Sequence, residues 1–428
     1  MILSFLIFAS SVLASPIFNK RFYDNDHNGI PDLCYTNGDV VSCLLSESSY
    51  VWTTFTASSS TVAPSPVSTT APATTSAASI TSAAATPSST TIYPTGSLPD
   101  ANTWKANNGT KWHVSTVGSL YSSTVSNLGW DNGRTSTLNN KSFWIFGDVL
   151  AFDGMQNGLS TGPSFYVTQD EMLRVDMGEI TNLNNVLLAP PAASDPAPTN
   201  PWPFLGLSTG NAVEVSPGIG LGFVWEISRN TSGTGPDRGL GMYRATLGDE
   251  TPIGNRTGPL IAGPDALPVG IMTIMAAEGY VYTYTNKNGP DGIVVGRAVV
   301  ADAFNPNAYE FLNLKGTWVQ GIPSYADAKL NYGVAGDVVP ISYGQGSAMW
   351  SNYLEKYMLF TGELGSAMMF YTSETPYGPF AGPYVIETVL GYGVNVHPFW
   401  SPDGSHKTLY ISSGWNNTIH MYKLDFDY

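Results

Sequence analysis

Short runs of β-branched and aromatic residues recur through the last three-quarters of the chain. Runs of this length and composition predict β-strands. Gly and Pro interrupt nearly every window of a dozen residues, so no helix of useful length is expected. The five most apolar runs look alike, and they occupy 143–148, 223–228, 280–285, 357–362 and 408–413.

Each apolar run belongs to a larger unit of three or four predicted strands. A second strand follows it, at 240–245, 293–298, 367–372 and 419–424, with a looser counterpart at 164–168 in the first unit. A strand with small or polar residues precedes it, at 125–130, 211–215, 270–276, 347–352 and 394–399. Such repetition predicts propeller blades rather than a sandwich. We therefore expect an all-β, five-bladed propeller over 100–428.

The predicted propeller needs a strand that joins its first and last blades, because an open edge exposes unpaired backbone groups. The last unit ends at Tyr428, too soon for a further strand. Residues 111–116 alternate as a strand does and precede the first unit. We predict that they pair with the last blade as its outer strand.

The N-terminal quarter differs in composition. Residues 1–15 form an apolar run that ends in small residues, which is typical of a signal peptide. Residues 16–21 are a candidate propeptide, because they end in a Lys-Arg pair that resembles a kexin-type site; an ordinary exposed basic pair is the alternative. Residues 49–99 are rich in Ser, Thr, Ala and Pro, which predicts a disordered, O-glycosylated linker.

Residues 22–48 form a small Asp-rich module ahead of the linker. Oxygen-bearing side chains alternate and a Gly stands at the sixth place, as in a calcium loop, but Tyr35 replaces the twelfth-place carboxylate. Calcium binding and a plain Asx-rich turn both remain open, and the stretch resembles a thrombospondin type-3 repeat. Cys34 and Cys43 most simply form a disulfide with each other. The candidate calcium ligands are Asp24, Asp26, Asn28 and Asp32.

Charge and composition narrow the class of partner. The net charge is −15, which argues against nucleic acid or anionic membrane. No later segment has the ~18 consecutive apolar residues of a membrane span. The 11 Trp and 23 Tyr, with many Asn, Ser, Thr and Gly, favour a neutral polysaccharide or cell-wall glycan. We expect a monomeric, secreted fungal glycoprotein, extracellular or wall-associated, with sequons at Asn108, Asn140, Asn230, Asn255 and Asn416.

Two stretches carry a family resemblance that covers about 100–428. The run 126–129 with 142–148, and the run 343–350 with 371–380, resemble the secreted propellers known as the domain-of-unknown-function 4185 family. Some members are endo-D-arabinanases, so the resemblance implies a glycan-hydrolase ancestry. Asn127 stands where relatives often carry Asp, and an amide cannot act as a general acid or base.

Glycoside hydrolysis usually requires two carboxyl groups across the scissile bond. Asp148 directly follows an apolar strand, where it either serves a site or caps a turn. The second acid is Asp131 or Glu214. Glu214 faces either the axis or solvent, because a one-residue register change reverses the side chain.

Several residues on predicted inner strands are candidate sugar contacts. His397 lies either in a pocket or in a hydrogen-bonded core. Trp130 and Trp350 are either sugar platforms or inter-blade packing. The full set is Asn127, Trp130, Trp350, Asn352, Asn395 and His397. The chain shows no zinc-protease spacing of histidines and no nucleophile elbow, so metalloenzyme and serine-esterase functions are disfavoured.

These observations predict a secreted glycan-directed hydrolase of the propeller type, acting on an arabinofuranose-type polysaccharide through paired carboxylates. Asp148 would act with Asp131 or Glu214. The alternative is a non-catalytic carbohydrate-binding propeller, displayed as a wall protein or adhesin, and a purely structural wall protein is a third. We expect no cofactor in the propeller, and calcium only at the N-terminal module.

Overall fold

The computed structural model of the protein describes its strands and most of its C-terminal three-quarters. The described residues are 22–23, 32–37, 40–44, 52–56, 112–122, 128–151, 166–167, 171–175, 189, 191–230, 233–247, 252–286, 292–333, 345–363, 367–387, 392–415 and 417–426. They belong to two compact units, one spanning Leu13–Ile92 and the other containing Tyr93–Tyr428.

The N-terminal unit contains one four-stranded antiparallel sheet. Its strands, in sheet order, are β1 (Phe22–Tyr23), β2 (Asp32–Asn37), β3 (Val40–Leu44) and β4 (Trp52–Thr56). The backbone register sets Cys34 opposite Cys43 across β2 and β3. The strand β4 lies inside the stretch 49–99 that we predicted to be linker.

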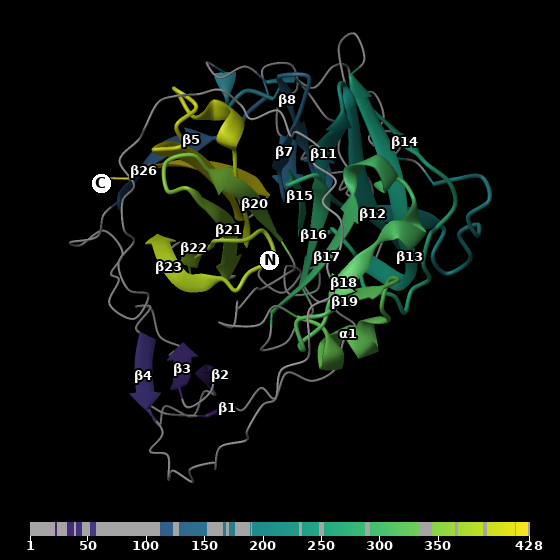
Figure 1. Ribbon diagram of the computed structural model, residues 1–428, viewed down its shortest axis with the longest axis horizontal. Coiled ribbons are helices and arrows are strands. Elements are labelled where there is room, and N and C mark those ends of the chain that lie inside the picture. The colour runs from purple at the N-terminus through teal and green to yellow at the C-terminus, as the bar shows by residue number, and fades with distance from the viewer. Residues whose placement is uncertain are drawn as a thin grey trace, which may run out of the picture. The chain divides into compact units, whose positions relative to one another are not determined.

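The C-terminal unit is built from antiparallel sheets in a propeller-like arrangement (Figure 1). One sheet contains β11 (Phe204–Ser216), β12 (Ile219–Asn230), β13 (Gly233–Leu247) and β14 (Pro252–Arg256), and the next contains β15 (Thr273–Ala277), β16 (Tyr280–Asn286), β17 (Ile293–Val299), β18 (Glu310–Leu312) and β19 (Trp318–Gln320). A third contains β20 (Gly346–Ser351), β21 (Lys356–Glu363), β22 (Ala367–Ser373) and β23 (Ala381–Glu387), and a fourth contains β24 (Tyr392–Val396), β25 (Thr408–Trp415), β26 (Thr418–Phe426) and β5 (Trp112–Ser119).

The blade count differs from the five that we predicted, because the described residues form four complete blades of four or five strands. A three-stranded sheet, β7 (Arg134–Leu138), β8 (Lys141–Ile145) and β10 (Tyr166–Val167), stands where the first blade was expected. The predicted inner strand at 125–130 is described only from residue 128, where it belongs to β6 (Leu128–Asp131), which pairs with β9 (Asp148–Ala151) in a separate ladder. The polar strand β7 therefore takes the inner position.

The innermost strands of the four blades, together with β7 of the three-stranded sheet, form a closed ring around the axis. The strand β7 contacts β11, β11 contacts β15, β15 contacts β20, β20 contacts β24, and β24 contacts β7. Figure 1 shows β7, β11, β15 and β20 gathered together, with later strands of their sheets farther out. Small residues permit this crowding: a Cβ at Gly210 would collide with the carbonyl oxygen of Gly270.

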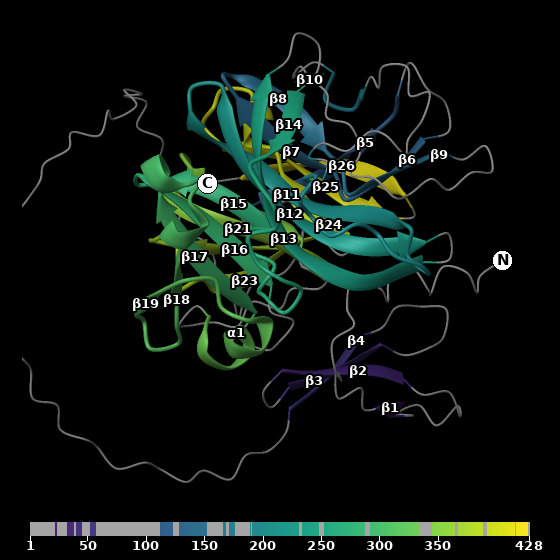
Figure 2. The same ribbon diagram turned by 90° about the vertical axis from the view of Figure 1, so that its right-hand side faces the viewer.

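The last blade is completed by the first strand of the domain, as we predicted. The strand β5 pairs antiparallel with β26, from Trp112 opposite Phe426 to Ser119 opposite His420. Figure 2 shows the resulting order of β5, β26, β25 and β24. Trp112 is buried and makes edge contacts with Phe370, Tyr384 and Phe426, so the closing strand also packs against the neighbouring blade.

The apolar cores lie between neighbouring sheets. One example joins Phe223 and Trp225 of β12 to Val281 and Val294 of the next sheet. Helical structure in the described residues is short and comprises η3 (Val300–Asp302), η4 (Pro306–Ala308), α1 (Tyr325–Asn331) and η5 (Pro398–Trp400). None of the helices in the described part of the chain is long and apolar enough to span a membrane.

Candidate functional site

A cavity of about 300 Å³ follows the propeller axis and is lined by all five inner strands. Most of its polar lining is neutral, from Thr135, Ser136, Thr137, Asn211, Thr273, Ser347 and Asn395. Arg134 and Glu214 are the charged residues among the described lining. A cavity of this size and polarity suits a small hydroxyl-rich group.

Some of the polar lining joins neighbouring inner strands. The Asn211 Oδ1 accepts hydrogen bonds from Thr273 Oγ1 (3.0 Å) and from the backbone N of Ile274 (2.8 Å). In the same way Ser347 Oγ accepts from the backbone N of Val396 (2.7 Å). These side chains stabilise the ring, so their polarity by itself does not indicate a ligand.

Three side-chain carbonyl oxygens lack partners among the described residues, on Asn132 before β7, on Gln345 before β20 and on Asn395 in β24. Asn132 Oδ1, Gln345 Oε1 and Asn395 Oδ1 are buried and have no hydrogen-bond donor among the described residues. A Cβ added to Gly393 would lie 2.5 Å from Gln345 Oε1 and 2.8 Å from Asn132 Oδ1, so both oxygens face the same small space. Asn395 is held nearby, because its Nδ2 donates to the carbonyl oxygens of Gly133 (3.0 Å) and Gly393 (2.7 Å).

Arg134 is a buried cation that begins β7 and is part of the cavity lining. It is only 2% exposed, and none of its three guanidinium nitrogens has a hydrogen-bond acceptor among the described residues. Burial lowers the pKa of Arg134 to about 10, and the electrostatic influence of Tyr243 and Asp131 opposes that shift. The side chain therefore keeps its charge at neutral pH.

Two of the predicted catalytic acids occupy paired positions on neighbouring strands. Asp131 ends β6 and Asp148 begins β9, and the register of these strands sets the two residues directly opposite each other. The backbone N of Gly147 donates to the carbonyl oxygen of Asp131 (2.8 Å), which fixes the crossing point. Asp131 immediately precedes Asn132, so the pair stands at the same end of β7 as the unpaired oxygens. The side chain of Asp148 lies outside the described part of the structure.

Glu214 lines the cavity near its other end. Its Oε1 accepts hydrogen bonds from the backbone N of Asn139 (2.9 Å) and of Gly218 (2.6 Å), so the carboxylate holds two turns. Asn139 follows the strand β7, whereas Asp131 precedes it. The extended stretch between them spans ~13 Å, more than the ~5–9.5 Å between paired catalytic carboxyls. This placement does not favour Glu214 as the second acid.

The predicted histidine contact lies in the core. His397 is fully buried, and its ring nitrogens hydrogen-bond with Thr135 Oγ1 and Ser412 Oγ, both at 2.8 Å. Its ring packs against Trp144 (4.9 Å between centroids) and Trp400 (4.8 Å). Burial lowers the pKa of His397 to about 3, so the ring is neutral at physiological pH.

The other residues that we predicted to contact sugar do not lie together. Asn127 lies outside the described residues, and Trp130 is buried against Phe146. Asn352 donates from Nδ2 to the carbonyl oxygen of Gly404 (2.9 Å), away from the cavity lining. Trp350 is 40% exposed at the far end of β20.

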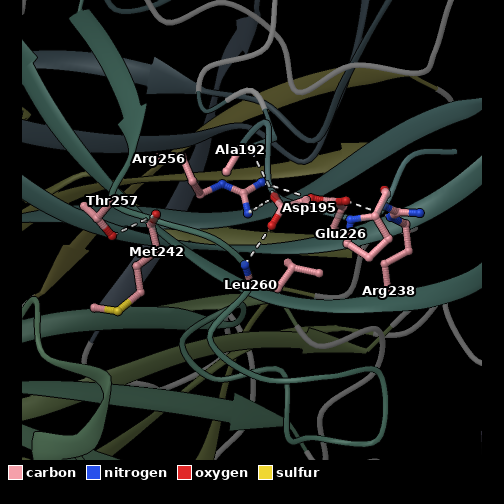
Figure 3. A network of polar contacts seen from close by, with 9 residues as sticks. Ala192, Asp195, Glu226, Arg238, Met242, Arg256, Thr257 and Leu260 are labelled. Carbon is pink, nitrogen blue, oxygen red and sulfur yellow. Dashed lines mark hydrogen bonds and ion pairs between the residues drawn. The ribbon is translucent and has the colours of Figure 1, made fainter.

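A buried ionic network joins β12, β13, β14 and the segment 191–200, and Figure 3 shows its side chains. Glu226 accepts from Arg238 Nε (2.7 Å) and from Arg256 Nη2 (3.1 Å). Asp195 lies 3.5 Å from Arg256 Nη1 and accepts from the backbone N of Leu260 (2.8 Å). The carboxylates of Glu226 and Asp195 are paired and buried, so the network stabilises the sheet and does not form part of the cavity.

The other predicted sites are only partly covered by the described residues. Asp24, Asp26, Asn28, Asn108 and Asn416 lie outside them, and Asp32 begins β2. The disulfide between Cys34 and Cys43 stays a prediction. The strand register places the two residues opposite each other. Asn140 and Asn255 are exposed, and Asn230 ends β12. The described residues hold no group of three or more His, Cys, Asp or Glu side chains that could bind a metal.

Sequence reasoning missed Arg134, Asn132 and Gln345. Arg134 begins the strand Arg-Thr-Ser-Thr-Leu, in which its position alternates with Thr135 and Thr137, so it shares a face with Ser136 and Leu138. Asn132 has φ 56°, which an Asn before a Gly favours. Neither pattern indicates that the polar atoms would lack partners.

No family model and no curated protein sequence matches the chain. Among solved structures, it is similar to the GH43_1 enzyme from Xanthomonas citri complexed with xylotriose, at 11% identity and a TM-score of 0.41, covering 72% of this chain and 89% of that one. It is also similar to CoXyl43, a GH43 β-xylosidase/α-arabinofuranosidase from a compost microbial metagenome, at 13% identity and a TM-score of 0.38, covering 70% and 91%. These similarities are too distant to assign a family or an activity to this chain.

Proposed function

We propose that the protein is a glycan-directed propeller that binds a sugar at the end of the axial cavity formed by β7, β20 and β24. One observation carries this proposal: Arg134 begins β7 two residues after Asn132 and has buried donors without acceptors among the described residues, while Asn132, Gln345 and Asn395 have buried oxygens without donors there. Each buried polar group left without a partner costs about 1–3 kcal/mol. A ligand that pairs with them recovers that free energy.

The chemistry of these groups selects the class of ligand. A carboxylate or phosphate could pair with Arg134 but could not donate to the three carbonyl oxygens, and an ammonium group could do only the reverse. A hydroxyl group both donates and accepts, so a polyol satisfies both sets. The mostly neutral lining and the net charge of −15 agree with an uncharged sugar. The resemblance in the sequence makes arabinofuranose-type polysaccharide the first ligand to test.

A titration of the purified protein with arabinan, xylan and mannan oligosaccharides tests this proposal. Gln345→Met removes an unpaired acceptor and keeps the length of the side chain. We expect it to weaken sugar affinity about 3- to 10-fold, the value of one hydrogen bond. It should also leave unchanged or raise the melting temperature of the ligand-free protein, because a buried unsatisfied oxygen is removed.

Gln320→Met is the matched control. Gln320 lies on β19, where its amide donates to the carbonyl oxygens of Asn307 and Tyr309 (3.1 Å to the latter). It should destabilise the protein slightly and leave sugar affinity intact. Sugar binding that is equal in the wild type and in Gln345→Met, or binding of none of the oligosaccharides, would show that these groups hold only solvent.

Hydrolysis of the bound glycan is a second candidate, favoured by the register of Asp131 and Asp148. Residues directly opposite in an antiparallel pair have Cβ atoms ~4.5–5.5 Å apart. Retaining glycosidases place their two carboxyl groups ~5–5.5 Å apart, with one as nucleophile and the other as acid and base. We propose that Asp131 and Asp148 supply this pair, in a secreted protein that meets its polysaccharide outside the cell.

New reducing ends in polysaccharide incubated with the protein would distinguish the two candidates. If the pair is catalytic, Asp131→Asn and Asp148→Asn should each lower the rate by ~10²–10⁴-fold and leave most of the sugar affinity. Binding without any new reducing ends would select the non-catalytic wall protein or adhesin. Turnover that survives both substitutions would exclude this carboxyl pair.

A further inference from the structure

Three side chains gather near the opposite end of the inner strands β15 and β20. Trp350 stands two residues after Ala348, and Glu278 stands two residues after Ala276, where both alanines line the cavity. Tyr357 lies between them: its ring packs against Trp350, and its hydroxyl donates to Glu278 Oε1 (2.8 Å). Trp350 and Glu278 therefore follow the cavity lining along these two segments without being part of it.

The exposure of Trp350 is unusual for this protein. Trp130, Trp144 and Trp400 are buried in contacts between sheets, whereas Trp350 is 40% exposed. Its ring nevertheless has a fixed position, because Tyr357 is its cross-strand partner and makes an edge contact at 4.8 Å and 66°. An exposed ring that is already held in place loses little freedom when a ligand stacks on it.

Glu278 occupies a backbone conformation that its residue type rarely adopts. It has φ 53°, and with Gly279 it forms the two-residue turn between β15 and β16. Turns with two positive φ values favour Asn or Gly at the first position. Here the turn places a carboxylate beside Tyr357 and Trp350.

We infer that Trp350, Tyr357 and Glu278 form a second binding site for a neutral glycan, separate from the site at the ends of β7, β20 and β24. A sugar ring stacks its C–H face on Trp350, and a sugar hydroxyl donates to the Glu278 carboxylate. The carboxylate and the net charge of −15 repel acidic polymers, so the ligand is uncharged. The second site does not require the first to bind sugar.

Affinity electrophoresis of the whole protein through gels containing arabinan, xylan, mannan or β-glucan tests this inference. Trp350→Ala should weaken retardation about 10-fold, as expected for one ring contact, whereas Trp350→Phe should keep most of it. Glu278→Gln should weaken it about 3-fold, through the loss of a charged acceptor. Phe204→Ala is the matched control, because Phe204 is also 40% exposed but lies on β11 away from the cluster.

The outcomes separate this site from the proposed axial site. Retardation lost in Trp350→Ala but kept in Gln345→Met supports the second site even if the axial site binds no sugar. The inference is overturned if no polysaccharide retards the wild type, if Trp350→Ala migrates like the wild type, or if Phe204→Ala loses retardation equally. In that last case the effect would belong to exposed rings in general.

Discussion

His397 makes the stability of the propeller depend on pH. Its imidazole is enclosed between Thr135 and Ser412, and burial lowers its pKa from 6.5 to about 3. In the unfolded chain the same ring titrates near its ordinary value. Below pH 6.5 the unfolded state therefore binds a proton that the folded state does not, and this difference favours unfolding.

The size of this effect follows from the pKa difference. The contribution of the neutral His397 ring to stability is fully present above pH 6.5 and is lost progressively as the pH falls toward 3. One pKa unit corresponds to about 1.4 kcal/mol, so the complete loss is about 5 kcal/mol, and the loss by pH 4.5 is about 3 kcal/mol. A domain with the usual ~5–15 kcal/mol of stability would lose a substantial fraction.

Urea unfolding at pH 7.5 and pH 4.5 measures this difference. His397→Gln keeps a side chain that can donate and accept toward Thr135 and Ser412, but it removes the titrating ring. We expect the variant to be less stable than the wild type at pH 7.5 and to lose about 3 kcal/mol less on acidification. His113→Gln removes an exposed histidine and serves as the control.

Equal losses in the wild type and in His397→Gln would refute this reasoning, because the acid sensitivity would then come from other groups. Asp403 and Asp425 are the alternatives. Hydrogen bonds from Ser405 lower the pKa of Asp403, and those from Lys423 and Thr408 lower that of Asp425 against the opposing effect of burial. Both are unchanged in the variant, so their contribution cancels in the comparison.

Three further predictions concern the fold. A chain that starts at residue 120 lacks β5 and should melt well below one that starts at residue 98; equal melting temperatures would contradict the pairing of β5 with β26. Gly210→Ala should destabilise the protein by more than about 1 kcal/mol in urea unfolding, because its Cβ would meet the Gly270 carbonyl. Glu226→Gln removes the buried carboxylate of Arg238, leaves Arg256 with Asp195 alone, and should cost about 3–5 kcal/mol, whereas Glu374→Gln, at an exposed ion pair with Lys356, should cost less than about 1 kcal/mol.

Most blade strands could be predicted from the sequence because their signal is local. The apolar runs at 223–228, 280–285 and 357–362 lie within β12, β16 and β21. Each run is buried along most of its length, and an apolar run of strand length is the local pattern that predicts a buried strand. The closing strand was also predictable, because an unpaired edge at the last blade requires a partner and few alternating segments remain.

The first sheet could not be predicted in the same way. The run 125–130 has the small residues of an inner strand, but its register is decided by pairing with β9, about twenty residues later. The true inner strand, β7, contains Arg and Thr, which local propensity does not assign to an axis.

The candidate site shows the same limit. Asp131 and Asp148 were predictable as acids, but their opposition depends on a non-local register. The unpaired atoms of Asn132, Gln345 and Asn395 depend on which neighbours lack donors, and no sequence pattern indicates that.

The pairing of β5 with β26 has a consequence for how the protein is made. Ser119 and His420 are 301 positions apart, yet their side chains hydrogen-bond at 2.9 Å. At the usual ~5–20 residues per second of synthesis, β5 leaves the ribosome about 15–60 s before its partner exists. During that interval Trp112, which ends in the core, has no blade to enter. The nascent chain must keep this strand soluble and unpaired until translation is nearly complete, so a ribosome that stops early releases a domain that cannot close.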